Sequence, residues 1–329
     1  MRFIIYGAGA VGGTIGGRLH QAGHDVTLIA RGDHLAALRR DGLTLGSPAG
    51  TAVLRIDAAG SPAEASPRPG DVVLLAMKSQ DTAAAVDDLA RAAPEGVPVV
   101  CAQNGVENER VAARVFPDVY AMSVMLPATH LRPGAIDANA TPLTGLLDLG
   151  RYPDGVDDTA EAVAAALAGA TFDSVARPDI MRWKYRKLVM NLVNSVEAVC
   201  GADGRTSPLP GLAMAEGEAV LAAAGVEPVS AAEDRARRGD RLSLRPVEGR
   251  RRQGGSSWQS LARGATTIES DYLNGEIVLL ACLHGIAAPV NERLQWWARR
   301  MVAEARPPGS VPPDVVLADI AAAGGPVPG

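Results

Sequence analysis

The sequence predicts an α/β fold in which an N-terminal Rossmann-type dinucleotide-binding domain is followed by an all-helical C-terminal domain. Short apolar runs rich in β-branched residues alternate with helical patterns in the first half, which is typical of a parallel sheet with helical crossovers. A glycine-rich turn joins the first run to the first helical pattern. Strand patterns largely vanish beyond residue 178, which places the domain boundary there.

The first half contains strand and helix patterns in regular alternation. Buried strands are predicted where β-branched runs are bounded by Gly, Pro or Asp, at residues 3–6, 25–30, 71–76 and 97–101. Helices are predicted between them at residues 11–21, 34–40 and 82–92, and an edge hairpin at 51–57. Further strands are predicted at residues 119–126, 135–138, 143–149 and 171–176, with a helix at 157–167.

The second half reads as helices. They are predicted at residues 180–199, 211–224, 257–284 and 291–305. Ser256 and Gln259 have the spacing of a capping box at the start of the third, and Gly285 follows its end as a C′ glycine. The Arg/Asp-rich residues 232–255 are expected to form a mobile connection or a polar helix. The expected domains are residues 1–178, 179–306 and a loose Pro/Gly-rich tail at 307–329.

Composition excludes several classes of function. The 329 residues carry 32 basic and 37 acidic side chains, so the net charge of −5 gives no reason to expect nucleic acid as a partner. Three widely spaced cysteines without a CxxC pair argue against a disulfide framework, and the five histidines lack metal-ligand spacing. Neither an export leader nor a membrane-length apolar run is evident, so a cytoplasmic location is expected.

A GxGxxG motif follows the first predicted strand and opens the first predicted helix. In this context the first glycine permits a tight turn, the second lets a pyrophosphate approach the backbone, and the third allows close helix–strand packing. The helix N-terminus adds N–H donors and a partial positive charge. The motif therefore predicts a dinucleotide site at Gly7, Ala8, Gly9, Ala10, Val11 and Gly12.

The residue after the second strand indicates which dinucleotide is bound. An NAD enzyme usually has Asp or Glu there, whereas this chain has Arg31, and Asp33 comes two residues later. A guanidinium suits a 2′-phosphate, so NADP(H) is predicted, the alternative being a surface arginine at a helix start. Lys78 and Asn104 follow two further strands on the same rim, where ligands bind in open α/β sheets, and both are predicted to contact the cofactor. Lys78 could instead be a solvated cation, and Asn104 a turn residue in an Asn-Gly pair.

Three polar residues share one face of the first long helix of the second half. Lys187, Asn191 and Asn194 are spaced i, i+4 and i+7, beside an apolar stripe. A lysine at such a border is usually extended toward solvent, so its position alone does not indicate catalysis.

With these motifs in order along nearly the whole chain, the sequence resembles the ketopantoate reductases (2-dehydropantoate 2-reductases). The matching pieces are Gly7 to Gly13, Met77-Lys78, Gln103 to Val106, Tyr185 to Leu188 with Asn191, Ser256-Ser257, and Ile268 to Gly275.

The resemblance implies a role for each matched residue. Lys187 matches the general acid that protonates the ketone oxygen, and Glu269 matches an acidic residue near that lysine and the cofactor. Asn104, Asn191 and Ser257 match substrate contacts, with Asn194 as a second helix amide. Glu269 could alternatively be a surface carboxylate paired with a neighbouring arginine. A homodimer formed through the helical domain is a further expectation from the family.

The substrate side departs from the family pattern. Gln253 to Gly255 replace an expected Asn, Cys200 to Arg205 replace an expected Asn-Gly-Glu, Ser260 replaces an Asp, and Asn194 lies one residue early. The predicted activity is therefore NADPH-dependent reduction of a 2-oxo acid, with 2-dehydropantoate going to (R)-pantoate in pantothenate and coenzyme A biosynthesis. The alternatives are another branched 2-oxo acid or biosynthetic ketone, or a non-catalytic NADP(H)-binding sensor.

Overall fold

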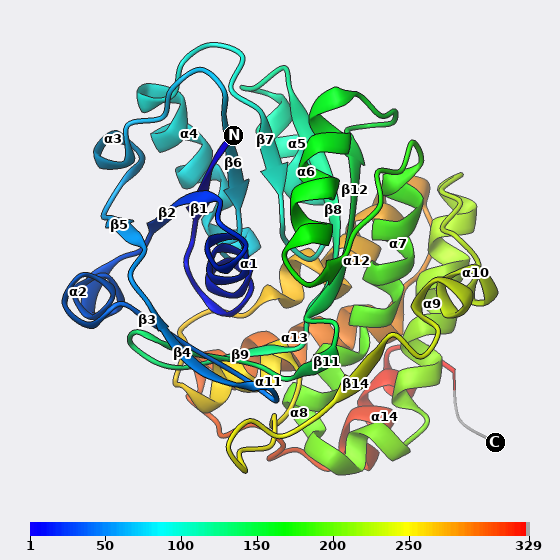
Figure 1. Ribbon diagram of the computed structural model, residues 1–329. Coiled ribbons are helices and arrows are strands. Elements are labelled where there is room, and N and C mark those ends of the chain that lie inside the picture. The colour runs from blue at the N-terminus through cyan, green and yellow to red at the C-terminus, as the bar shows by residue number, and fades with distance from the viewer. Residues whose placement is uncertain (327–329) are drawn as a thin grey trace. The chain divides into compact units, whose positions relative to one another are not determined.

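The computed structural model describes residues 1–326 (Figure 1). The chain forms two compact units. Unit 1 comprises Met1–Lys184 and Ala231–Arg252, and unit 2 comprises Tyr185–Ser230 and the chain from Gln253 onward. The α/β and helical halves predicted from the sequence are confirmed.

Unit 1 is built on an eight-stranded sheet in the order β13-β12-β8-β7-β6-β1-β2-β5. Every neighbouring pair is parallel except β8 and β12. The strands are β1 (Arg2–Tyr6), β2 (Asp25–Ile29), β5 (Asp57–Ala59), β6 (Asp71–Leu75), β7 (Val99–Cys101), β8 (Val119–Met125), β12 (Gly145–Arg151) and β13 (Phe172–Asp173). The order places β1 between β2 and β6, which is the switch point where open α/β sheets bind ligands.

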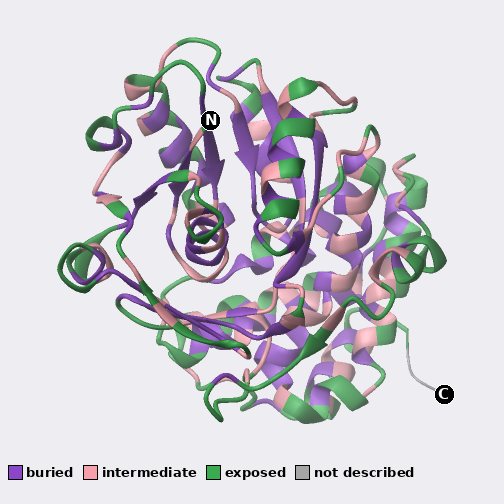
Figure 2. Cartoon of the chain, viewed as in Figure 1, coloured by how far each residue is buried: buried purple, intermediate pink, exposed green. Residues whose placement is uncertain are grey.

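Both faces of this sheet are buried, as the colouring of its strands in Figure 2 shows. Phe3 and Ile5 of β1 point into one apolar cluster, while Ile4 and Tyr6 point into another. This alternation explains the continuous apolar runs of the strands. The first cluster includes α1 (Ala10–Gln21), α2 (Gly32–Asp41) and α6 (Asp158–Gly169); the second includes α3 (Pro62–Ala65), α4 (Thr82–Ala92) and α5 (Glu107–Ala113).

Helix α1 lies between this sheet and a second, four-stranded one. The strands of the second sheet, in order, are β4 (Gly50–Leu54), β3 (Leu43–Ser47), β10 (Ala135–Ala138) and β9 (Ala128–Arg132). Gly12 and Gly16 face the main sheet, and Gly13 and Gly17 face the second one. A Cβ atom added at Gly13 would lie 2.3 Å from Cδ1 of Ile136. The glycine pairs therefore let two sheets approach one helix closely.

The arginine-rich segment belongs to unit 1. It forms α10 (Ala231–Arg238), a polar helix, and β14 (Leu242–Leu244), which pairs with β11 (Ala140–Pro142). Arg237 donates 2.7 Å hydrogen bonds to Asp148 and Asp173, and Arg250 donates to Asp137. These ion pairs hold residues 231–252 in unit 1, whose first segment continues to Lys184, six residues beyond the predicted boundary at 178.

Unit 2 contains shorter helices than the sequence predicts. Residues 180–199 are divided between α7 and α8 at Leu192, whose backbone keeps helical angles (φ −57°, ψ −29°) and whose carbonyl accepts a hydrogen bond from the Asn274 side chain, 3.1 Å away. The kink of α8 lies further along, at Gly201 (φ 65°). Residues 257–284 are interrupted after α11, where Gly264 has φ +68°. The helices are α7 (Ile180–Asn191), which begins in unit 1, α8 (Val193–Thr206), α9 (Leu209–Ala223), α11 (Ser256–Ala262), η2 (Glu269–Tyr272), α12 (Asn274–His284), α13 (Pro289–Ala303) and α14 (Pro313–Ala322).

Helix ends and the C-terminal segment correct two further expectations. The N-cap of α11 is Gly255, and Gln259 donates to preceding carbonyls, so the predicted capping box is wrong. Gly285 is confirmed as a left-handed C-cap. The tail is not loose over α14, since Val316 and Ile320 are fully buried. Residues 327–329 lie outside the described part of the chain.

Within residues 1–326, no helix combines the length and apolar character needed to cross a membrane.

Candidate functional site

The glycine-rich turn between β1 and α1 is held closely on one side and open on the other. Gly7 has φ +103°, and a Cβ there would lie 2.6 Å from the main-chain nitrogen of Met77. The N–H groups of Gly7 and Ala8 both donate to the carbonyl of Ile29, at 3.1 and 3.0 Å. A Cβ at Gly9 would meet no atom within 4 Å. The turn therefore leaves room beside Gly9 for a ligand.

The first turn of α1 provides the polar groups beside the open space at Gly9. Gly9 is the N-cap, Ala10, Val11 and Gly12 follow, and no acidic residue occupies the first turn. N–H groups in a first helical turn lack intrahelical acceptors and attract anions. The open side of Gly9 and this uncharged helix start fit the pyrophosphate of a dinucleotide.

The other predicted residues of unit 1 lie on the same edge of the sheet. Arg31 is the exposed N-cap of α2 after β2, Lys78 precedes the short helix η1 (Ser79–Asp81) after β6, and Asn104 follows β7. Because β7, β6, β1 and β2 are consecutive and parallel in the sheet, their carboxyl ends meet at one edge. The structure thus brings Arg31, Lys78 and Asn104 to the edge that carries the glycine turn.

A buried amide connects the Lys78 and Asn104 loops. Asn108 is 1% exposed, and its Nδ2 donates to the carbonyl of Asn104 at 2.9 Å and to the hydroxyl of Ser79 at 3.3 Å. Its Oδ1 accepts from the Thr82 hydroxyl at 2.8 Å. All the donors of the Asn108 amide are therefore used to join the two loops.

A second buried contact supports the same region. Gln103 donates through Nε2 to the carbonyl of Met77 at 3.1 Å, and its own carbonyl accepts from Nζ of Lys184 at 3.1 Å. Lys184 also forms an ion pair with Glu109. Burial raises the pKa of the Glu109 carboxyl, while the attraction of Lys184 opposes this.

In unit 2, α7 and α8 carry three of the predicted site residues. Lys187 is half-buried on α7, Asn191 is its buried last residue, and Asn194 is half-buried on α8. Leu192, where α7 meets α8, lies between the two amides. Asn274, which donates to the Leu192 carbonyl, is fully buried and also bonds Ser195 and Asn291.

Asn194 lies against the segment that precedes Ser257. Its Oδ1 is 3.2 Å from the position a Cβ would take on Gly255, and Glu197 accepts a 2.9 Å hydrogen bond from the Gly255 N–H. Glu197 also pairs with Arg205, whose side chain is largely exposed. Ser257 is buried in the first turn of α11. Asn194 and the start of α11 are thus brought together.

Glu269 is the buried first residue of η2. Its pairing with Lys187 stays a prediction.

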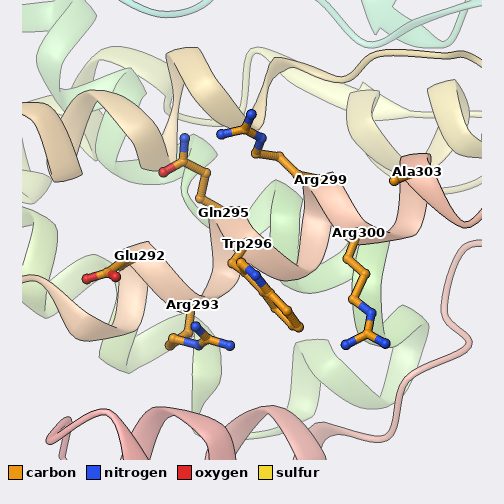
Figure 3. Close-up of a pocket in the computed structure, with 7 residues that line it drawn as sticks. All are labelled: Glu292, Arg293, Gln295, Trp296, Arg299, Arg300 and Ala303. Atoms are coloured by element: carbon orange, nitrogen blue, oxygen red, sulfur yellow. The ribbon is translucent and has the colours of Figure 1, made fainter.

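A separate pocket lies on α13. It is lined by residues of that helix alone: Glu292, Arg293, Gln295, Trp296, Arg299, Arg300 and Ala303. Figure 3 shows Trp296 between Arg293 and Arg300, whose guanidinium carbons lie 4.4 and 5.1 Å from the centroid of the Trp296 ring. None of the residues predicted to bind cofactor or substrate lines this pocket.

Sequence reasoning missed the residues that support the site. Asn108 follows Asn104 by one helical turn, and this spacing is the local pattern that could have suggested it. Asn274 lies in the Glu269–Gly275 motif, yet its contacts are with distant helices. Lys184 and Glu109 are 75 residues apart, so no local pattern indicates their pairing.

Comparison with known proteins gives the family. The profile described as "Ketopantoate reductase PanE/ApbA" matches residues 3–153, and that of its C-terminal domain matches residues 179–301. The 2-dehydropantoate 2-reductases of Archaeoglobus fulgidus and Pyrococcus horikoshii are 31% and 29% identical, over 89% and 91% of this chain and 95% and 96% of theirs. The crystal structure of a PanE/ApbA family ketopantoate reductase from Ralstonia eutropha superposes with a TM-score of 0.77 at 28% identity, covering 93% of this chain and 100% of that one. The predicted resemblance is confirmed: this chain belongs to the ketopantoate reductase family of oxidoreductases.

Proposed function

We propose that this protein is an NADPH-dependent 2-oxo acid reductase that converts 2-dehydropantoate to (R)-pantoate. The observation that carries the proposal is the glycine turn, which is open at Gly9 and lies on the same sheet edge as the loops of Lys78 and Asn104, in a chain of this family. A turn that is crowded at Gly7 and open at Gly9 suits a pyrophosphate.

The preference for NADPH is inferred from the end of β2. Arg31 is exposed as the N-cap of α2, and the strand ends without a carboxylate that could bind a ribose 2′-hydroxyl. Asp33 falls within the first turn of α2. A guanidinium can hold a 2′-phosphate through two parallel hydrogen bonds, so Arg31 would favour NADPH over NADH.

Lys187 is proposed as the general acid. A bound reduced nicotinamide supplies a hydride to the carbonyl carbon of the substrate. Lys187 gives its proton to the carbonyl oxygen, so the ketone becomes an alcohol with its charge balanced. A cation there stabilises the negative charge that develops on this oxygen, and Glu269 favours the protonated lysine.

Asn104, Asn191, Asn194 and Ser257 are proposed to bind the substrate. A second 2-oxo acid as the natural substrate is favoured by the Glu197–Arg205 pair beside Gly255. This pair places the charge of Arg205, which lies in one departing segment, against Glu197, which accepts a hydrogen bond from Gly255 of the other.

The test is a steady-state assay of NADPH oxidation with 2-dehydropantoate and with a panel of branched and linear 2-oxo acids. We expect turnover with 2-dehydropantoate and a higher kcat/KM with NADPH than with NADH. A preference for another acid would establish the second candidate. Tight NADPH binding without oxidation by any acid would instead indicate a sensor and contradict a reductase.

A further inference from the structure

His34 on α2 binds the glycine turn through its side chain. Its Nε2 lies 2.7 Å from the carbonyl oxygen of Ala8, and its Nδ1 lies 2.9 Å from the main-chain nitrogen of Gly134. A carbonyl can only accept, so Nε2 must carry the proton. A main-chain N–H can only donate, so Nδ1 must be bare. The geometry thus requires a neutral imidazole in one defined tautomer.

The contact controls a peptide group of the proposed cofactor site. The Ala8 carbonyl and the Gly9 N–H belong to one trans peptide plane and point in opposite directions. Holding the carbonyl toward His34 therefore directs the Gly9 N–H away from it. The N–H of Ala8 is already bonded to Ile29, so His34 fixes the other side of this residue.

We propose that His34 is a positioning residue for dinucleotide binding, which orients the Ala8–Gly9 peptide for the pyrophosphate. This inference rests on the proposed cofactor. It adds a side chain that lies outside the glycine motif and joins α2 and the β9–β10 turn to the cofactor site.

The surroundings favour the neutral form that the contact needs. Burial lowers the pKa of His34, although the hydrogen bond to Ala8 opposes this. The ring of His130 on β9 packs against it in an edge arrangement, with the ring centroids 4.5 Å apart, and Arg132 lies further along that strand. Arg31 and Asp33 lie on its own helix, whereas the glycine turn and Gly134 bring no ionisable side chain. Protonation of Nδ1 would direct its N–H against the main-chain N–H of Gly134 and break the hydrogen bond between them.

Two amide variants separate the two hydrogen bonds. A Gln side chain can place its NH₂ near the position of Nε2, whereas the shorter Asn reaches only that of Nδ1. His34→Gln should therefore keep the Ala8 contact without a titrating group, and His34→Asn should lose it. His24→Leu is the matched control, since this histidine of unit 1 contacts Phe3.

The experiment is a fluorescence titration of each protein with NADPH and with NADH between about pH 5.5 and 8, with thermal melting to verify folding. At neutral pH we expect the Kd of NADPH to rise about 10-fold in His34→Asn and to change less than about 3-fold in His34→Gln and His24→Leu. Below neutral pH the wild-type Kd should rise relative to that of His34→Gln. NADH, which lacks the titrating 2′-phosphate, should show the same difference.

The outcomes separate this inference from the proposed function. Equal Kd values for His34→Asn and wild type, or equal losses in the Asn and Gln variants, would overturn the role of His34 alone. Failure of the wild-type protein to bind either dinucleotide would overturn the proposed cofactor together with this inference.

Discussion

Lys184 and Glu109 form an ion pair in which the two side chains are only 2% and 0% exposed. The same ammonium group donates to the carbonyl of Gln103, next to Asn104. Desolvating two charges is costly, and the cost is offset only while both partners are present. The pair therefore ties the stability of unit 1 to the loop that carries Asn104.

Lys184→Met should destabilise the protein by about 3–5 kcal/mol, because it leaves the Glu109 carboxylate buried without its partner. Urea denaturation at neutral pH measures the loss. Arg91→Ala is the control, since it removes a largely exposed ion pair and should leave the free energy of unfolding nearly unchanged. A loss no larger than that of the control would contradict the structural role of the pair.

The Lys184→Met variant should also respond to pH in a defined direction. Burial raises the pKa of Glu109 in the folded protein, and removing Lys184 raises it further. Because the folded state then binds a proton more tightly than the unfolded state, the variant should regain stability as the pH falls from about 7 toward 5. The double variant Lys184→Met with Glu109→Gln, which has no carboxyl to titrate, should show no such gain.

Gly13→Ala should destabilise unit 1 by about 1–3 kcal/mol, because its Cβ would overlap Ile136. Ile136→Val removes the overlapping methyl group, so the double variant should recover part of the loss. Gly211→Ala on α9 is the control: a Cβ there meets no atom within 4 Å, and it should stabilise the helix by about 0.5–1 kcal/mol. Thermal melting of the wild type, Gly13→Ala, the double variant and Gly211→Ala measures these changes in stability. Equal effects at Gly13 and Gly211 would show that α1 has room for a side chain.

Lys187→Ala should lower kcat by about 10²-fold or more while leaving the Kd of NADPH unchanged, because a general acid acts in the transition state. Fluorescence titration and steady-state kinetics measure the two quantities separately. Full turnover in this variant would refute the assignment of Lys187 as the acid.

Arg31→Ala should raise the Kd of NADPH by about 10- to 100-fold, since it removes a charged hydrogen-bond donor from the 2′-phosphate. The Kd of NADH should change less than about 3-fold. Comparing the two cofactors in one variant provides an internal control. A parallel loss for both would mean that Arg31 supports the fold of the loop and does not discriminate between them.

Asn108→Asp should lower kcat/KM by about 10-fold or more, because the carboxylate cannot donate to the Asn104 carbonyl. Kinetics in the Asn104→Ala background test whether the effect passes through Asn104. If it does, adding Asn108→Asp to Asn104→Ala should cost little more. Additive losses would assign Asn108 a role independent of Asn104.

Much of unit 1 could be predicted because its determinants are local. Residues 71–76 and 82–92 read correctly as strand and helix, since a β-branched run and a helical repeat lie within single segments. The glycine motif is equally local: Gly7 and Gly9 differ in crowding because of their places in one turn.

The elements that were missed depend on distant partners. Strand β14 forms only against β11, about a hundred residues away in the sequence. Asn274 bonds the Leu192 carbonyl from a helix far along the chain, and α14 packs through its buried residues Val316 and Ile320. Such partners cannot be identified from a local sequence pattern, so the loose tail and the single helix over residues 257–284 are incorrect expectations.

The same distinction applies to the site. Arg31, Lys78 and Asn104 could be placed on one edge because each follows a strand of a parallel sheet. The groups that hold this edge could not: His34 reaches a nitrogen 100 residues away, and Lys184 reaches Glu109 across 75. Their side chains are ordinary in their local context and acquire a role only through the fold.

The return of residues 231–252 to unit 1 means that the chain passes between the units three times. A fragment that ended at Lys184 would strip Asp148 of Arg237 and Asp137 of Arg250, leaving buried carboxylates short of counter-charge. Swapping the helical unit for that of a relative therefore requires three splice points, because a chimera joined only after Lys184 would lose Arg237 and Arg250 from unit 1.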